Sequence, residues 1–88
     1  MEESLLSGLI DLKIEKILKV FIQNKEQLFH LKKISSQSKV PLTTTFSIIK
    51  KLARLDIIKI SKIGKLKLYK LAENKKTSFL ETILIKNE

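Results

Sequence analysis

The chain has 88 residues, of which 43% are hydrophobic and 31% charged, with two glycines, one proline and no cysteine. This composition is typical of a folded chain, and it excludes disulfide bonds and cysteine metal sites. The formal net charge of +9, from 18 basic and 9 acidic residues, favours a polyanionic partner, most often nucleic acid. A lysine-rich surface that serves only solubility is the alternative.

The amino-terminal extension, residues 1–10, is acidic where a secretion signal is basic. Since no apolar run approaches the roughly 20 residues of a membrane span, we expect neither secretion nor membrane insertion. The expected location is the cytoplasm, in association with the nucleoid. At this length we expect one domain over residues 1–88, with a thin core that a partner subunit would support.

Two amphipathic segments follow. Residues 11–24 have apolar side chains spaced three and four apart, which predicts a helix with one buried stripe. Residues 28–30 predict a short extended piece. Residues 31–39 predict a second, shorter helix, in which Leu31 and Ile34 face inward.

Residues 41–55 predict a third helix, with Pro41 in the first turn, where a proline is tolerated. Its expected buried side is a stripe with two flanking residues: Thr45, Ile49, Leu52 and Leu55, flanked by Phe46 and Ile48. The opposite side carries hydrogen-bond donors and no carboxylate: Thr43, Thr44, Ser47, Lys50, Lys51 and Arg54. The alternatives for this side are a solvated helix face and, for Thr43, a helix cap.

Residues 57–71 change to an alternating pattern on both sides of Gly64, which predicts a β-hairpin. Basic side chains surround the expected turn: Lys59, Lys62, Lys65 and Lys67. They would carry positive charge toward a DNA groove or backbone. Lysines also discourage edge-to-edge pairing of sheets, which is the alternative reading.

The carboxy-terminal segment, residues 78–86, predicts a short closing helix with Thr77 or Ser78 as its N-cap, and Ser78 with Glu81 as a capping box. The two ends of the chain together hold more apolar surface than the core needs, so we expect a two-fold homodimer through them. The expected interface residues are Leu5, Leu6, Leu9, Ile10, Phe79, Leu80, Ile83 and Leu84. The alternative is a monomer whose last helix folds back onto its first.

Several pieces follow one another in residues 34–71: the small residue Ser35 before the turn at 39–41, the opening 42–46 of the long helix, and the returning strand at 69–71. Together they resemble a winged helix-turn-helix domain, as found in small regulators of the MarR and ArsR groups and common in archaea and their viruses. The resemblance implies a mainly α fold with a small β-hairpin (α+β): a three-helix core, a two-stranded wing and a C-terminal helix.

Two residues depart from that pattern. Lys39 and Asp56 stand where winged-helix proteins often have glycine, one at the turn and one at the exit of the recognition helix. Both positions can use a positive φ, which Asp tolerates better than Lys.

The resemblance implies double-stranded DNA as the partner and transcription regulation as the role, with the recognition helix in the major groove. Thr44 and Ser47 are short enough to approach base edges, and threonine methyls can touch the thymine methyl, whereas the longer lysines suit phosphates. Arg54 is the one arginine, so we expect affinity dominated by phosphate contacts. A protein-binding adaptor of the transcription or replication machinery and a nonspecific chromatin protein are the alternatives.

An enzyme is not expected. His30 is the sole histidine, there is no cysteine, and the chain has no glycine-rich phosphate loop or paired carboxylates. We therefore expect no catalytic residue, no metal and no cofactor.

Overall fold

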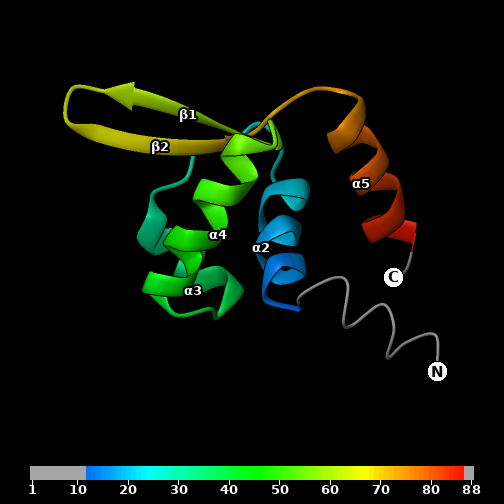
Figure 1. Ribbon diagram of the computed structural model, residues 1–88, viewed down its shortest axis with the longest axis horizontal. Coiled ribbons are helices and arrows are strands. Elements are labelled where there is room, and N and C mark those ends of the chain that lie inside the picture. The colour runs from blue at the N-terminus through cyan, green and yellow to red at the C-terminus, as the bar shows by residue number, and fades with distance from the viewer. Residues whose placement is uncertain (1–11, 87–88) are drawn as a thin grey trace.

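Four helices and one hairpin make up residues 12–86, the part of the chain described by this computed structural model (Figure 1). The elements are α2 (Leu12–Gln23), α3 (Leu31–Ser38), α4 (Leu42–Arg54), β1 (Ile58–Ile63), β2 (Leu66–Leu71) and α5 (Lys75–Lys86). Helices α2, α3 and α4 pack together, the hairpin projects beyond them to one side, and α5 lies beside α2 on the other side (Figure 1). The predicted fold class, mainly α with a two-stranded hairpin, is confirmed.

The core lies where α2, α3 and α4 meet. Four of its side chains are no more than 1% exposed: Ile17, Phe21, Ile34 and Ile49. Spacings of three and four residues bring such side chains to one side of each helix, so the three apolar stripes face one another. Phe29, from the segment after α2, meets Phe21 edge to face, with ring centroids 5.4 Å apart.

The predicted extended piece before α3 is confirmed at Phe29, which pairs with β2. The Phe29 amide donates to the carbonyl oxygen of Tyr69, and the Tyr69 amide donates to the carbonyl oxygen of Phe29. Both hydrogen bonds have a length of 2.8 Å. Both side chains are buried. This exchange fastens the base of the hairpin to the helical core.

The turn between α3 and α4 is held by bonds that converge on Val40. The Ser35 hydroxyl donates to the Val40 carbonyl oxygen at 2.6 Å, and the buried Thr45 hydroxyl donates to the same oxygen at 3.1 Å. Lys39, just before it, has φ 60°, so the positive φ considered for this position is observed. A short hydroxyl on each helix therefore fixes the angle at which α4 leaves α3.

The exit of α4 also uses a left-handed residue, because Asp56 has φ 62°. The Ile57 amide then donates to the Leu52 carbonyl oxygen at 2.9 Å, which closes the end of the helix. Leu55 was predicted on the buried stripe, and this is wrong: it is 50% exposed. The helix ends at Arg54, so Leu55 no longer continues the stripe.

The hairpin is antiparallel, with Ile58 opposite Leu71 at its base and Ile63 opposite Leu66 at its tip. The two residues between the strands are Gly64 and Lys65, and Gly64 has φ 63°, a conformation that suits the first position of a two-residue hairpin turn. The base is buried and the tip is exposed, since Ile58 and Leu71 belong to the core while Ile63 and Leu66 do not.

Helix α5 begins at Lys75, three residues before the predicted start at Ser78, and the predicted caps are wrong. Asn74 is the residue that caps it: its side-chain oxygen accepts from the Thr77 amide at 3.0 Å, and its own amide donates to the Thr77 hydroxyl at 3.1 Å. This is a reciprocal arrangement of the capping-box kind. Glu81 pairs instead with Lys25, 2.8 Å away in the turn after α2.

Candidate nucleic-acid interface

The outer side of α4 displays the donors that the sequence placed there. The buried stripe consists of Thr45, Ile48, Ile49 and Leu52, so the residues about half a turn away face solvent. Five predicted contact residues are exposed and one is half-buried: Thr43, Ser47, Lys50, Lys51 and Arg54, with Thr44 half-buried. Phe46, predicted on the flank of the buried stripe, is 42% exposed, so it belongs to the outer side as well.

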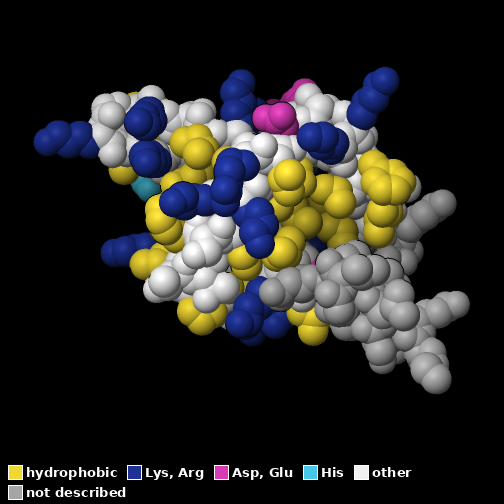
Figure 2. Space-filling view, viewed as in Figure 1, with side chains coloured by type: hydrophobic (Ala, Val, Ile, Leu, Met, Phe, Trp, Pro, Cys, Tyr) yellow, Lys and Arg dark blue, Asp and Glu magenta, His cyan; other side chains and the backbone are white. Residues whose placement is uncertain are grey.

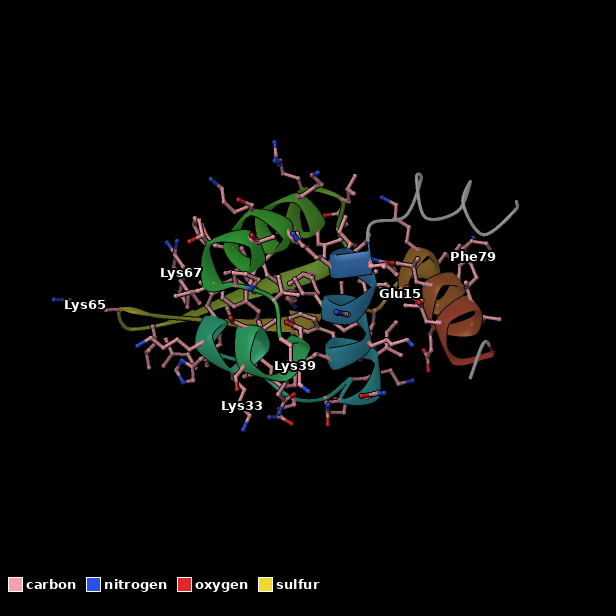
Figure 3. All side chains as sticks on the ribbon, turned by 90° about the horizontal axis from the view of Figure 1, so that it is seen from below. Glu15, Lys33, Lys39, Lys65, Lys67 and Phe79 are labelled. Atoms are coloured by element: carbon pink, nitrogen blue, oxygen red, sulfur yellow. The ribbon has the colours of Figure 1, made fainter. Side chains whose placement is uncertain are left out.

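The hairpin adds lysines on two different faces. All four predicted lysines are exposed, but only some share a side with α4. Lys62 lies opposite Lys67 on the face that also carries the buried Tyr69, whereas Lys59 lies opposite Lys70 on the other face. Figure 3 shows Lys67 on the side of α4 and Lys65 at the tip.

A groove of about 730 Å³ separates the hairpin from the start of α4. It is lined by His30, Leu31, Lys32, Lys33, Leu42, Lys67 and Tyr69. Leu31, Leu42 and Tyr69 make much of the lining apolar, and the charged side chains of the lining are all lysines. The outer side of α4 and the Lys67 face of the hairpin thus border one continuous surface.

The charge on this surface is predominantly positive. Among residues 42–71 the sole carboxylate is Asp56, at the exit of α4. Figure 2 shows basic side chains over α4 and the hairpin and also near the start of α5, with the few visible acidic ones at the top of the view between the hairpin and α5. Two lysines face each other across the strands at 62 and 67, a like-charge pairing that costs the hairpin some stability.

Comparisons with known sequences found no match: no protein-family model fits the chain, and no curated protein matches it. Solved structures do match. AF1382 from Archaeoglobus fulgidus superposes with a TM-score of 0.74 at 20% sequence identity, over 94% of this chain and 96% of that one. The MarR family transcriptional regulator SPO1453 from Silicibacter pomeroyi DSS-3 gives a TM-score of 0.74 at 8% identity, over 97% of this chain and 59% of that one. A mutant of ZitR from Lactococcus lactis superposes with a TM-score of 0.63 at 19% sequence identity, over 81% of this chain and 49% of that one.

The fold is a winged helix-turn-helix. In it, α3 and α4 form the helix-turn-helix pair, α4 is the recognition helix and the β1–β2 hairpin is the wing. At identities of 8–20% the likeness is one of fold, and this chain spans only about half to three fifths of the SPO1453 and ZitR chains. Function must therefore be argued from the surface of this chain.

Three apolar residues on this surface were missed by sequence reasoning. Leu42 and Phe46 of the recognition helix are each 42% exposed, and Ile60 of the wing is 43% exposed. The Lys50 ammonium lies 5.4 Å from the centroid of the Phe46 ring, within range of a cation–π contact. The signal in the sequence was the spacing of four between Phe46 and Lys50, which puts both on one side of a helix.

The residues predicted to form a dimer interface divide into three groups. Leu5, Leu6, Leu9 and Ile10 lie outside the described residues. On α5, Leu84 is buried and Leu80 packs against the core, so both serve their own chain. Phe79 and Ile83 remain exposed, at 65% and 37%, and Figure 3 shows Phe79 at the end of the molecule far from the wing.

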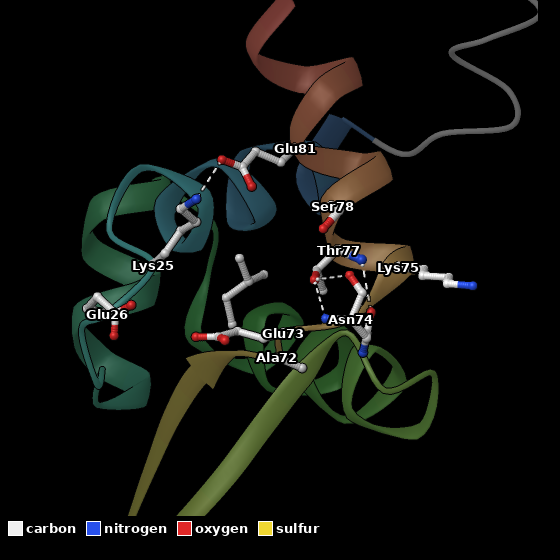
Figure 4. A pocket seen from close by; sticks show the side chains of 10 residues that line it. Lys25, Glu26, Ala72, Glu73, Asn74, Lys75, Thr77, Ser78 and Glu81 are labelled. Carbon is white, nitrogen blue, oxygen red and sulfur yellow. Dashed lines mark hydrogen bonds and ion pairs between the residues drawn. The ribbon is translucent and has the colours of Figure 1, made fainter.

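A second hollow, of about 680 Å³, lies between the turn after α2 and the start of α5 (Figure 4). Its charged lining mixes Lys25 and Lys75 with Glu26, Glu73 and Glu81. The opposite charges include the Lys25–Glu81 pair, so this hollow lacks the predominantly positive charge of the α4 surface.

Residues 12–86 contain one histidine and no cysteine. His30 is exposed at the rim of the groove below the wing. No three His, Cys, Asp or Glu side chains of the described residues gather in a way that would hold a metal ion. None of the described helices combines the length and apolar character needed to cross a membrane.

Proposed function

We propose that this protein binds double-stranded DNA and regulates transcription, with α4 in the major groove and the wing on the adjacent backbone or groove. One observation carries the proposal: the outer side of α4 and the Lys67 face of the wing border one surface that is basic and rich in donors. Asp56 is its sole carboxylate within residues 42–71. A phosphate backbone is the partner that such a surface fits best.

The side chains on this surface differ in reach, and we assign their roles accordingly. Thr43, Thr44 and Ser47 are short and lie in the first half of α4, the half of a recognition helix that usually approaches base edges. Lys50, Lys51 and Arg54 are longer and suit phosphates. With one arginine among the basic residues, bidentate reading of guanine contributes little, so affinity rests mainly on the backbone.

Four wing lysines belong to the proposed DNA contact, but not equally. Lys62 and Lys67 share the face directed toward α4, and Lys65 projects from the tip. Lys59 lies on the opposite face. We therefore expect Lys59 to contribute least.

A two-fold homodimer through α5 is part of the proposal, because Phe79 and Ile83 leave apolar surface uncovered. A dimer would place two recognition helices about one DNA turn apart. Sedimentation equilibrium at micromolar concentration tests it: a mass twice the 10.2 kDa of the chain is expected. The monomer mass at all concentrations would remove the dimer.

The DNA proposal is tested by fluorescence anisotropy on a random duplex and on duplexes selected from a randomised pool, at about 50 to 200 mM salt. We expect steep salt dependence and a selected duplex bound at least about 10³ times more tightly than the random one. Equal binding to all duplexes would instead indicate a nonspecific chromatin protein.

A protein-binding adaptor is the second candidate, and the exposed apolar residues at the α2 and α5 end favour it. Leu12 is 60% exposed and Phe79 is 65% exposed, both away from the basic surface. An adaptor would bind no duplex even at low salt. Its partner would bind equally well to variants altered at Thr44 or Ser47.

A further inference from the structure

An exposed apolar strip runs along the side of α4 that faces the wing. Leu42 and Phe46 are one helical turn apart, and each is 42% exposed. Leu42 also lines the groove shared with Lys67 and Tyr69, which identifies this side of α4 as the one directed to the wing. Neither residue belongs to the core, so packing within the chain does not account for them.

The strip borders the donors that the proposed function assigns to DNA. At 100° per residue, Phe46 lies only about 40° from Lys50 around the helix axis. The Lys50 ammonium is 5.4 Å from the ring centroid, a contact that limits the orientations of the ring. On the wing, Ile60 lies on the same face as Lys67 and is also exposed.

A helix that enters the major groove with an apolar side chain in its first half meets one apolar group there. That group is the C5 methyl of thymine, since the other base edges are hydrogen-bond donors and acceptors. Leu42 and Phe46 are the first and fifth residues of α4. Lysines around the strip provide the phosphate contacts that would hold it against the base edges.

We infer that Leu42 and Phe46 form an apolar subsite for thymine methyl groups, with Phe46 as the residue that sets a preference for A·T base pairs. This inference rests on the proposed DNA binding and adds its specificity. Phe46 and Lys50 then act in different ways: the ring recognises the methyl group, and the ammonium group contributes salt-dependent affinity for phosphate.

The experiment compares duplexes that differ only in this methyl group. The probes are an alternating A·T duplex, the same duplex with uracil in place of thymine, an alternating G·C duplex, and that duplex with 5-methylcytosine. For each methyl group in contact, we expect uracil to weaken binding about fourfold, the equivalent of roughly 0.8 kcal/mol for one buried methyl-sized group. Methylation of cytosine should strengthen binding by a similar factor.

Variants separate the ring from the charge. Phe46→Ala should bind the thymine and uracil duplexes equally, while its salt dependence stays that of the wild type. Phe46→Leu keeps an apolar side chain and should retain part of the difference. Lys50→Gln should keep the methyl preference and lower the salt slope by about 0.9. Leu12→Ala, which truncates an exposed apolar side chain of α2 outside the proposed dimer interface, is the matched control and should change neither the methyl preference nor the salt slope.

The outcomes are distinct for the two proposals. If wild-type protein binds all duplexes but does not distinguish thymine from uracil, the inference is wrong and DNA binding stands. If it binds no duplex at low salt, the proposed function fails and the inference fails with it. A methyl preference that survives in Phe46→Ala would also overturn the inference, since the preference would then come from threonine methyls. Far-ultraviolet circular dichroism confirms that each variant is folded.

Discussion

The helical core and the wing contain similar apolar side chains, but these are buried in the core and largely exposed to solvent in the wing. In the core, Ile17, Phe21 and Ile49 are at most 1% exposed. In the wing, Ile63 and Leu66 occur in an equally apolar pattern but are 59% and 50% exposed. Only the base of the wing, which is fastened through Phe29 and Tyr69, belongs to the core.

This difference separates stability from binding. The residues that hold the protein folded lie between α2, α3 and α4, and the charges proposed to hold DNA lie on the outside of α4 and along the wing. Beyond its base the wing buries little apolar surface. Its outer half can therefore hold two lysines opposite each other, although this cross-strand pairing of like charges is unfavourable. Substitutions in the two regions should therefore change different measured quantities.

The largest expected effect is in the core. Phe21→Ala should reduce the free energy of unfolding by about 3–5 kcal/mol, because it removes a fully buried ring that also packs on Phe29. This is much of the total stability of a small domain. Ile63→Ala, at the exposed wing tip, should change it by less than about 0.5 kcal/mol. Urea denaturation measures both, and equal losses would break the proposed separation.

The next effect is on DNA affinity. The double variant Lys62→Gln with Lys67→Gln should lower the salt slope by about 1.8 and weaken binding roughly 60-fold near 100 mM salt. Its stability should stay the same or rise slightly, because the two like charges face each other. Anisotropy titrations and urea denaturation give the two values.

A matched pair of single variants sharpens this result. Lys67→Gln removes a charge from the α4 side of the wing and should weaken binding about eightfold near 100 mM salt. Lys59→Gln removes an equal charge from the other face and should have less than a twofold effect. Equal losses would mean that charge alone matters, and not the face on which it lies.

The course of the chain was largely predictable from the sequence, since a 3.6-residue period produces the helices and an alternating period around Gly64 produces the hairpin. The spacing of four places Phe46 beside Lys50, but it does not show that this flank of α4 is exposed. Phe46 is as apolar as the core residues, and only the position of the wing relative to α4 decides that this side stays open. The start of α5 was predicted wrongly because the Ser78–Glu81 pair has the same spacing of three residues as the cap that Asn74 and Thr77 form.

The sequence could have predicted that the wing lysines divide between two faces, because this division depends only on strand register. Once Gly64 and Lys65 are the turn, Lys62 must lie opposite Lys67. The sequence could not predict which of the two faces is directed toward α4. That choice depends on the pairing of Phe29 with Tyr69, residues 40 positions apart in the chain. The β-bridge between Phe29 and Tyr69 thus decides which wing lysines lie on the same side as the recognition helix.

A smaller effect is expected at the turn that aims α4. Lys39 has φ 60°, a conformation that costs an ordinary residue about 1–2 kcal/mol and glycine almost nothing. Lys39→Gly should therefore stabilise the protein by about 0.5–1 kcal/mol, after the extra freedom of glycine in the unfolded chain is subtracted. Asp56→Gly, at φ 62°, should gain less, because Asp tolerates this conformation better.

The Lys39→Gly gain should leave DNA binding unchanged, since Lys39 is not among the residues proposed to contact DNA. Urea denaturation and anisotropy titration of the same preparation test both statements. A loss of stability would mean that the lysine side chain makes a contribution larger than the backbone cost. A loss of DNA affinity would place Lys39 within the interface.

The smallest effect is expected at the far end, where Lys25 pairs with Glu81 at 2.8 Å. The hydrogen bond and charge of Glu81 raise the pKa of Lys25 above its ordinary value of 10.5. A raised lysine pKa means that the stabilisation is present below that ordinary value and is lost as the pH rises through the folded-state pKa. The pair should therefore add no slope to stability between pH 6 and pH 9.

Because Lys25 is exposed, solvent and salt screen the pair, and Lys25→Met should barely change the midpoint of thermal unfolding at pH 7. Leu84→Ala, which removes a buried contact of the same helix, should lower the midpoint clearly. Thermal scans at pH 7 in low and in high salt decide between them. If Lys25→Met were as damaging as Leu84→Ala in low salt, and harmless in high salt, α5 would be held by charge and not by packing.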